Sequence, residues 1–351
     1  MKTIIRGIFP ALALLSCLTV TTAAQTQPVY SVKKIWSSAP HNAFTDLMEY
    51  EGQYYCTFRE GTGHTPAKDG TGDGKIRILV SPDGNKWKSA ALIAKKGLDL
   101  RDPKLSITPD GRLMVSIGAS VYKNGQLMSR SPYVSFKDKN AKIFSDPRPV
   151  MIDSRIQFDK NWLWRVTWDK DTGYGVVYQQ HPPKEEWKVF LVKTPDGINY
   201  ELVTRLDVPG NPNEAAVEIP ENGKMRIIIR RGAGNGWLGY SEKDYTKWKW
   251  DDLGIRLGGP GIITLPNGKT IIASRSFGEK TNTTFNARTA LFTLDKNGRA
   301  VQLLELPSGK DTSYPGLLVN KDELWMSYYS GHEGQTSIYF AKIKYESLFA
   351  R

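Results

Sequence analysis

The sequence predicts an all-β protein, a six-bladed β-propeller, and three observations support this prediction. A turn that usually ends in Gly is followed by an apolar or alternating strand six times, at intervals of roughly 45 to 62 residues, the length of a four-stranded blade. Gly, Pro, Asn and Asp interrupt the chain throughout. No stretch of about twelve residues carries an apolar stripe of helical period. Six such units would form six blades around one axis.

The repeated unit places charged or phenolic residues at the ends of several strands. In chain order the strands are Gln53–Phe58, Arg112–Ile117, Tyr174–Tyr178, Lys224–Ile229, Lys269–Ala273 and Glu323–Tyr329. The residues at their ends are Arg59-Glu60, Arg230-Arg231, Arg275 and Tyr328-Tyr329. Because a closed ring brings one strand of each blade to the axis, we expect the functional residues at these strand ends.

Three further segments complete the predicted ring. Residues 25–35 form an opening segment that we expect to close the ring, and the alternation of Ile338–Ile343 predicts the last strand. The Gly- and Thr-rich stretch Gly61–Gly74 is a long loop between two strands of the first blade. Long loops on a rigid scaffold commonly carry function, so this loop is a place to look for it.

Composition excludes several classes of protein. With 40% hydrophobic and 24% charged residues and a mean hydropathy of −0.42, the 351-residue chain cannot be a polytopic membrane protein. The uninterrupted repeat favours one propeller domain over residues 25–351. The net charge of +12 is scattered along the chain, which argues against a nucleic-acid groove and favours a small acidic substrate. We expect a monomer that acts on a glycan or glycoconjugate.

Residues 1–24 have the features of a cleaved targeting segment. Lys2 and Arg6 give it a positive start, Ile8–Val20 is apolar, and Thr22-Ala23-Ala24 is a small-residue cleavage site. We therefore expect export to the periplasm or the exterior, with no transmembrane segment in the mature chain and a net charge of +10 once Lys2 and Arg6 are removed.

The two cysteines have different expected fates. A second interpretation of the targeting segment makes Cys17 a lipidation site, although the apolar stretch that continues beyond it argues against this. Cys56 lies in an apolar strand and is the one cysteine left in the mature chain, so we expect a small buried residue and no disulfide within the chain.

A second repeated element lies on hairpin turns. Ser81-Pro82-Asp83-Gly84-Asn85-Lys86-Trp87 is followed by Thr194-Pro195-Asp196-Gly197-Ile198-Asn199-Tyr200, with a weaker copy at residues 241–248. The hydroxyl and carboxylate can accept hydrogen bonds from turn amides, Gly supplies a positive φ, and the aromatic ring packs under the hairpin. We expect these turns to be structural, on the outer side of the ring, and not to bind metal.

These turns look like Asp boxes, and with the count of six blades they make the chain resemble the sialidase (neuraminidase) superfamily of glycoside hydrolases. The resemblance covers nearly all of the mature chain. The chain resembles a bacterial subgroup most, through Phe58-Arg59-Glu60-Gly61, Leu100-Arg101-Asp102-Pro103 and Ser327-Tyr328-Tyr329-Ser330-Gly331-His332-Glu333. This resemblance implies an exo-acting hydrolase of a terminal acidic sugar, with sialic acid favoured and no cofactor or metal.

The resemblance also implies a set of catalytic residues. Tyr314, in Ser313-Tyr314-Pro315-Gly316, matches the superfamily's nucleophile, and Glu214 matches the glutamate that assists it. Arg230, sixteen residues after Glu214, and Arg288 match arginines that bind the substrate carboxylate.

The implied general acid is an aspartate in a loop of the first blade. Asp69, twelve residues before Ser81, fits that position, with Asp73 as the second choice. Asp102 resembles an aspartate of the second blade that lines the substrate pocket.

One part of the superfamily's pattern is missing. The Phe-Arg-Ile-Pro motif that opens its first blade corresponds here to Asn42-Ala43-Phe44-Thr45-Asp46-Leu47, which has no arginine. Arg59, Arg101 or Arg275 could take the place of the missing guanidinium from another strand.

Two alternatives follow from this gap. One is a propeller glycosidase or lyase that acts on another sugar, for example a uronate-linked one, with His64 or His332 as acid and base. The other is a carbohydrate-binding propeller without catalytic activity. No pair of histidines has the sequence spacing of metal ligands, so we expect no metal site.

Overall fold

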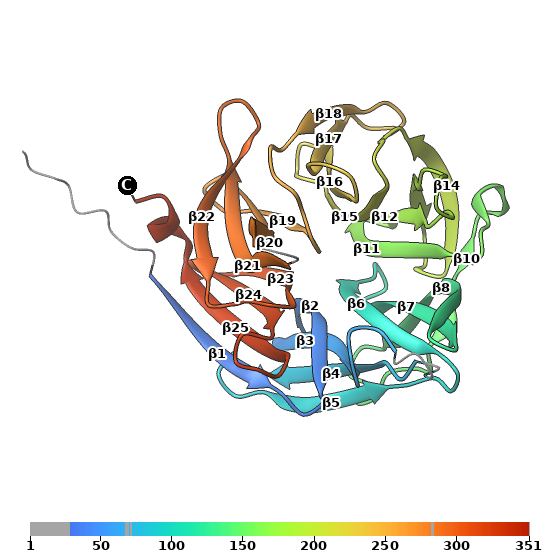
Figure 1. The fold of residues 1–351 in the computed structure, drawn as a ribbon, viewed down its shortest axis with the longest axis horizontal. Coiled ribbons are helices and arrows are strands. Elements are labelled where there is room, and N and C mark those ends of the chain that lie inside the picture. Colours follow the sequence, from blue (N-terminus) through green and yellow to red (C-terminus); the bar gives the residue numbers. More distant parts are fainter. Residues whose placement is uncertain (1–28, 67–69, 71, 282–283, 351) are drawn as a thin grey trace, which may run out of the picture.

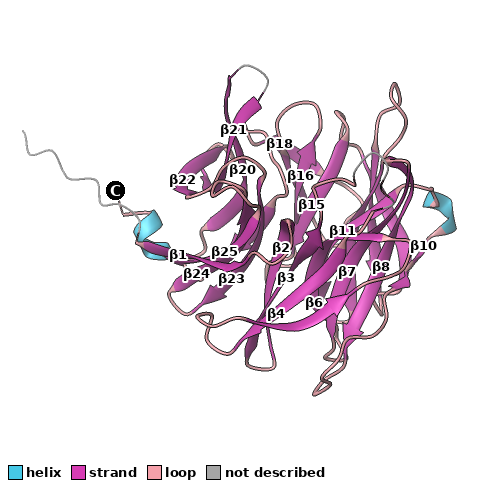
Figure 2. Cartoon of the chain, turned by 60° about the horizontal axis from the view of Figure 1, so that its bottom comes forward, coloured by secondary structure: helices cyan, strands magenta, loops and turns pink. Residues whose placement is uncertain are grey.

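The protein is a six-bladed β-propeller, as the sequence predicted (Figure 1). The structure is a computed structural model and describes residues 29–66, 70, 72–281 and 284–350. Five of its six sheets have four strands and one has five. Within the described ranges, helix is confined to two short 3-10 turns, Ser154–Ile156 and Tyr345–Leu348, at the outer edge of the ring (Figure 2).

The blades follow one another along the chain. The first has β2 (His41–Tyr50), β3 (Gln53–Gly61), β4 (Lys75–Ser81) and β5 (Lys88–Ile93). The second has β6 (Asp99–Ile107), β7 (Leu113–Lys123), β8 (Gln126–Lys137) and β9 (Arg148–Pro149). The third has β11 (Asn161–Asp169), β12 (Thr172–Gln179), β13 (Lys188–Thr194), β14 (Asn199–Leu206) and the short parallel β10 (Met151–Ile152).

The last three blades have four strands each. The fourth has β15 (Pro212–Glu218), β16 (Met225–Arg231), β17 (Trp237–Ser241) and β18 (Lys249–Asp252). The fifth has β19 (Gly261–Thr264), β20 (Thr270–Thr281), β21 (Thr284–Leu294) and β22 (Ala300–Leu306). The sixth has β23 (Thr312–Asn320), β24 (Glu323–Ser330), β25 (Ser337–Lys344) and, from the other end of the chain, β1 (Tyr30–Trp36).

Strand β1 closes the ring. It runs antiparallel to β25, from Tyr30 opposite Ile343 to Trp36 opposite Ile338, and so becomes the outer strand of the last blade (Figure 1). This confirms the closing role predicted for the opening segment, as far as that segment is described, and the final strand predicted over Ile338–Ile343.

The position of the repeated strands corrects one expectation. They are β3, β7, β12, β16, β20 and β24, which stand second in their blades. The strands that contact one another around the axis are those just before them: β2, β6, β11, β15, β19 and β23. The axis is therefore lined by strands that the turn-and-strand repeat did not identify.

Blades pack face to face through alternating side chains. On β16, Ile227 and Ile229 pack into the cluster shared with the third blade, whereas Ile228 packs with Ile272 in the cluster shared with the fifth. All three isoleucines are fully buried, because both faces of an inner sheet are covered. Each contributes about 1.5–3 kcal/mol by leaving water.

The hairpin turns have the predicted hydrogen bonds and lie between the outer strands of their blades. Ser81 Oγ accepts from the Gly84 amide at 2.8 Å, and Asp83 accepts from the Asn85 amide at 2.8 Å. Gly84 has a φ of +71°, and an added Cβ would lie 2.7 Å from the Trp325 ring. The turn at Thr194 repeats these bonds through Gly197 and Asp196.

The remaining expectations concern membrane spans, the targeting segment and the cysteines. No helix among the described residues is long and apolar enough to span a membrane. The predicted targeting segment and Cys17 lie outside the described residues. Cys56 is a buried free cysteine on β3, as predicted, and burial raises the pKa of its thiol.

Candidate active site

A pocket of about 280 Å³ opens where the inner strands of several blades meet. Cationic, acidic and aromatic side chains line it together, and they come from all six blades. The lining consists of Phe44, His64, Thr65, Arg101, Asp102, Tyr122, Arg130, Trp162, Tyr178, Glu214, Arg230, Arg275 and Tyr314.

Four inner strands carry a β-bulge at this pocket, where two residues face one residue of the neighbouring strand. The bulged pairs are Phe44-Thr45, Asp102-Pro103, Asn213-Glu214 and Tyr314-Pro315. A bulge turns a side chain away from its regular alternation. Three of the bulged residues have positive φ: Phe44 at 65°, Asp102 at 50° and Tyr314 at 53°. Such angles are uncommon for bulky residues and are typical of functional sites.

Tyr314 and Glu214 form the centre of the site. The Tyr314 hydroxyl donates to Glu214 Oε1 at 2.5 Å, and both residues are 7% exposed. The other oxygen, Oε2, accepts from the Gly259 amide at 2.8 Å. A Cβ added to Gly259 would lie 2.3 Å from the Tyr314 ring, so a glycine lets the ring take this place.

Arg230 completes this group. Its Nη1 donates to Glu214 Oε1 at 2.7 Å and to the Tyr314 hydroxyl at 3.3 Å. Burial opposes ionisation of Glu214, but Arg230 and hydrogen bonds hold the pKa of its carboxyl below the usual value. Burial and then the charge of Glu214 raise the pKa of Tyr314 well above its usual value. The group is therefore a neutral phenol beside an ionised carboxylate that can accept its proton.

Arg275 and Arg101 each lie near an aromatic ring of the pocket. The Arg275 guanidinium carbon lies 5.6 Å from the centre of the Tyr314 ring, and the side chain is held by the Thr312 carbonyl at 2.8 Å. Arg101 lies 5.2 Å from the Phe44 ring and donates to the His64 carbonyl at 2.9 Å.

Asp102 enters the pocket from the second blade. Burial raises the pKa of its carboxyl, and it is 8% exposed. Its Oδ1 is buried and has no hydrogen-bond partner among the described residues, which leaves an acceptor for a bound ligand.

Two arginines singled out from the sequence lie elsewhere. Arg59 is fully buried and makes a two-bond ion pair with Asp99, at 2.9 Å for each bond, so it braces the first blade against the second. Arg288 lies outside the pocket lining, where its Nε is 3.5 Å from Glu305. The structure therefore places Arg275, not Arg288, beside Tyr314.

The acidic and histidine candidates also differ in whether they line the pocket. Asp69 lies outside the described residues. Asp73 accepts from the Thr62 amide at 3.0 Å and so fastens the loop that follows β3. His332 contacts Ser330 at 2.9 Å and does not line the pocket, whereas His64 does.

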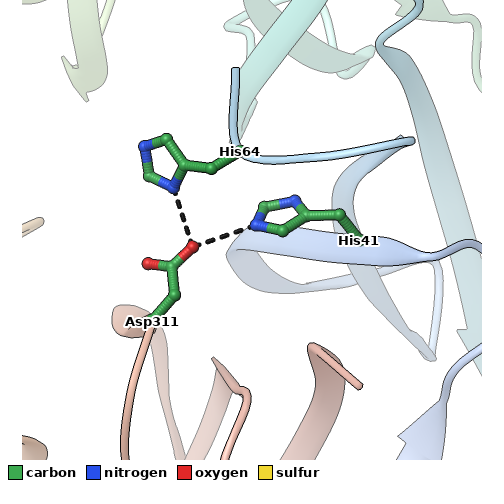
Figure 3. A group of neighbouring side chains, drawn as sticks. All are labelled: His41, His64 and Asp311. Carbon is green, nitrogen blue, oxygen red and sulfur yellow. Dashed lines mark hydrogen bonds and ion pairs between the residues drawn. The ribbon is translucent and has the colours of Figure 1, made fainter. Parts of the chain in front are cut away.

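His64 has partners that sequence reasoning did not assign. Its Nδ1 lies 2.7 Å from Asp311 Oδ2, which is also 2.9 Å from His41 Nε2 (Figure 3). The three residues come from the first and last blades, so only ring closure brings them together. Phe44 belongs to the stretch Asn42–Leu47, which was noticed in the sequence for its missing arginine, but its own place in the pocket was not predicted.

The fold resembles solved propellers, although the sequence does not identify a family. No protein-family model matches the chain, and no curated protein matches it by sequence. A protein of unknown function from Dyadobacter fermentans is 16% identical with a TM-score of 0.74, over 89% of this chain and 99% of that one.

Two structures of known enzymes are also similar. The sialidase of Trypanosoma rangeli, in complex with sialic acid, is 12% identical with a TM-score of 0.69 over 91% of this chain, which spans 60% of the sialidase. An α-L-arabinofuranosidase of Fusarium graminearum is 14% identical with a TM-score of 0.65, over 91% of this chain and 99% of that one. The chain therefore has a sialidase-like six-bladed β-propeller fold.

Proposed function

We propose that this protein is an exo-acting, retaining glycoside hydrolase with Tyr314 as its nucleophile. The observation that supports this most is the buried hydrogen bond of 2.5 Å from the Tyr314 hydroxyl to Glu214, beside Arg230. Two of the structurally similar proteins are glycoside hydrolases by name, a sialidase and an arabinofuranosidase.

In the first step the Tyr314 oxygen attacks the anomeric carbon while its proton passes to Glu214 Oε1. The bond from the anomeric carbon to the leaving oxygen breaks, a general acid gives that oxygen a proton, and a glycosyl-tyrosine intermediate forms. In the second step water gives a proton to the same acid–base group and displaces the Tyr314 oxygen, which recovers its proton from Glu214. Two displacements at one carbon give net retention of configuration.

The charge of the pocket favours an acidic terminal sugar, and sialic acid is the first candidate. Arg101, Arg130, Arg230 and Arg275 line the pocket with two carboxylates, Asp102 and Glu214. Within the described residues, Arg230 donates only through Nη1 and Arg275 only through Nε and Nη2, so each keeps a nitrogen for a substrate carboxylate.

A second candidate is a glycosidase or lyase that acts on another terminal sugar, for example a uronate-linked one. The observation that favours it is Phe44, an apolar ring at the bulge of the first blade, in the stretch that lacks the arginine of the superfamily's motif. Of the three arginines that the resemblance implies, Arg230 alone lines the pocket, so the arginines of this pocket are arranged differently from those expected for a sialic acid carboxylate.

The test compares Tyr314→Phe with wild-type protein on 4-methylumbelliferyl glycosides of sialic acid, glucuronic acid and α-L-arabinofuranose. We expect one of them to be cleaved by the wild type and the variant to be slower by about 10²–10⁴-fold. Tyr240→Phe, on β17 and outside the pocket lining, is the matched control and should keep wild-type turnover. Equal turnover by Tyr314→Phe, or glycan binding without turnover by wild type, would reject the proposal.

A further inference from the structure

His64 occupies the pocket with one ring nitrogen fixed and the other unused. Its Nδ1 lies 2.7 Å from Asp311 Oδ2, and Figure 3 shows the second ring nitrogen pointing away from Asp311. The His64 side chain is 49% exposed and lines the same pocket as Tyr314. Its Nε2 has no hydrogen bond to any described residue.

Asp311 is held rigidly beneath this ring. His41 Nε2 lies 2.9 Å from Oδ2, the Tyr329 hydroxyl donates to Oδ1 at 2.8 Å, and Arg275 Nη2 approaches Oδ1 at 3.4 Å. Burial opposes its ionisation, but hydrogen bonds from His41 and His64 hold the pKa of this carboxyl far below the usual range. An ionised carboxylate opposite Nδ1 keeps the hydrogen of His64 on Nδ1, which directs Nε2 to exchange protons with a ligand.

His64 and Tyr314 both contact the aromatic ring of Phe44. The Phe44 ring lies 5.2 Å from the His64 ring and 5.1 Å from the Tyr314 ring, both in edge-on contacts. Arg101 fastens the loop by donating to the His64 carbonyl at 2.9 Å. A sugar with its anomeric carbon at Tyr314 would therefore lie in the pocket that His64 also lines.

The same three side chains also form a set of metal-type donors. The donor atoms of His41, His64 and Asp311 lie within 4.8 Å of one another. However, the Arg275 guanidinium contacts Asp311, and both oxygens of Asp311 already accept from protein groups. A nearby positive charge opposes cation binding, so these contacts favour an imidazole and carboxylate pair.

We propose that His64 is the general acid and base of the glycosidase reaction and that Asp311 is its positioning residue; this rests on the proposed function. The cycle starts from the His64 imidazolium, which carries a hydrogen on each ring nitrogen. In the first step its Nε2 gives a proton to the glycosidic oxygen as the bond to the anomeric carbon breaks and Tyr314 attacks. In the second step Nε2 takes a proton from water as the water oxygen bonds to the anomeric carbon. His64 ends as it began, so the cycle is balanced.

The experiment uses two sialosides with different leaving groups, 4-methylumbelliferyl sialoside and sialyllactose. The aryl group leaves without a proton, whereas the sugar alkoxide needs one. We expect His64→Gln to lose about 10²–10⁴-fold of kcat/KM on sialyllactose and far less on the aryl sialoside, with azide accelerating aryl turnover. Asp311→Asn should show the same contrast to a smaller degree, because a purely structural role would slow both substrates equally.

A control variant and a variant of the alternative acid are measured beside these two, and thermal unfolding of each confirms that it folds. His332→Gln, outside the pocket, should match wild type on both substrates. Asp69→Asn tests the acid implied by the sequence resemblance. If Asp69→Asn shows the leaving-group contrast and His64→Gln does not, the assignment of His64 is wrong.

Failure of the inference differs from failure of the proposed function. If wild type cleaves and Tyr314→Phe does not, but His64→Gln equals wild type on both substrates, only the role of His64 is overturned. Loss of activity with EDTA and recovery with Zn²⁺ would also overturn it, in favour of a metal site. If wild type cleaves neither sialoside nor the glucuronide and arabinofuranoside, the proposed function fails and this inference fails with it.

Discussion

At the scale of the residue, the site depends on a glycine, Gly259, whose lack of a side chain makes room for the Tyr314 ring. Gly259 has a φ of +60°, donates its amide hydrogen to Glu214 and lies against the Tyr314 ring. We predict that Gly259→Ala displaces this ring, because the new Cβ would lie 2.3 Å from it. Turnover should fall by about 10²-fold, since small misplacements of reacting groups are costly.

A matched control separates displacement from backbone strain. Gly268 has a φ of +78° and nothing within 4 Å of an added Cβ. Gly268→Ala should therefore cost about 1–2 kcal/mol of stability and leave turnover unchanged. The two variants are compared by urea unfolding and by kcat; similar kcat values in both would show that the contact with Tyr314 does not matter.

His41 should make stability depend on pH. Burial lowers the pKa of His41 despite its bond to Asp311, and His64 and Arg59 add to the lowering. As the pH falls, His41 is therefore protonated in the unfolded chain before it is protonated in the folded one. The free energy of unfolding should fall as the pH drops below about 6.5. The pKa of Asp311 is held low, so protonation of its carboxyl should add a further loss below about pH 4.

Urea unfolding across about pH 2–8 checks this prediction. In His41→Gln the decline that begins near pH 6.5 should shrink, whereas the decline below pH 4 should remain. A wild-type curve that is flat between pH 6.5 and 5, or one identical to that of the variant, would contradict it.

At the scale of the element, the bulges are tied together by buried polar groups on the axis. The Thr45 hydroxyl donates to the Tyr314 carbonyl at 2.8 Å and accepts from Ser327 at 2.9 Å. Lys104 donates to the Thr45 carbonyl at 2.8 Å, and Asp46 accepts from the Leu105 amide at 2.8 Å. The inner strands β2, β6 and β23 therefore fix one another's bulges.

Thr45→Val tests this coupling with little change in volume. It should leave the Tyr314 carbonyl with one bond fewer, cost about 1–3 kcal/mol and also lower kcat, because the bulge that presents Tyr314 loosens. Thr57→Val is the control: its hydroxyl donates to the Arg77 carbonyl at 3.1 Å, a bond between β3 and β4 that does not join inner strands. It should lose similar stability and keep kcat. Equal kcat values in the two variants would rule the coupling out.

These elements also show how far sequence reasoning reaches. The blades were predictable because turns and alternating strands are local patterns, whereas Tyr314, Glu214 and Arg230 were singled out by the resemblance to the sialidase superfamily. The bulges of the inner strands have no comparable signal, because an extra residue is defined only against its partner strand. The place of Phe44 in the pocket was missed for that reason.

At the scale of the whole molecule, closure of the ring brings together residues that lie far apart in the sequence, and local sequence patterns do not predict such contacts. Asp311 contacts His41 and His64 from 270 and 247 positions away. Such pairs depend on the number of blades and on how the ring closes, not on any local pattern. Arg288 shows the converse, because its side chain pairs with Glu305 on the neighbouring strand while Arg275 reaches Tyr314.

Closure itself can be tested by removing β1. Without it, β25 becomes an exposed edge, and the contacts of β1 with the first blade are lost, including the bond from Trp36 Nε1 to Glu60 at 2.7 Å. A chain that begins at residue 37 should be less stable than one that begins at residue 25 by on the order of 3–5 kcal/mol, from the lost ladder of backbone hydrogen bonds. It should also aggregate, because an unpaired edge accepts strands from other molecules. Urea unfolding and light scattering measure both effects, and a synthetic peptide of residues 25–36 should restore part of the stability. Equal unfolding midpoints for the two chains would mean that the contacts between β2 and β23 hold the ring closed without β1.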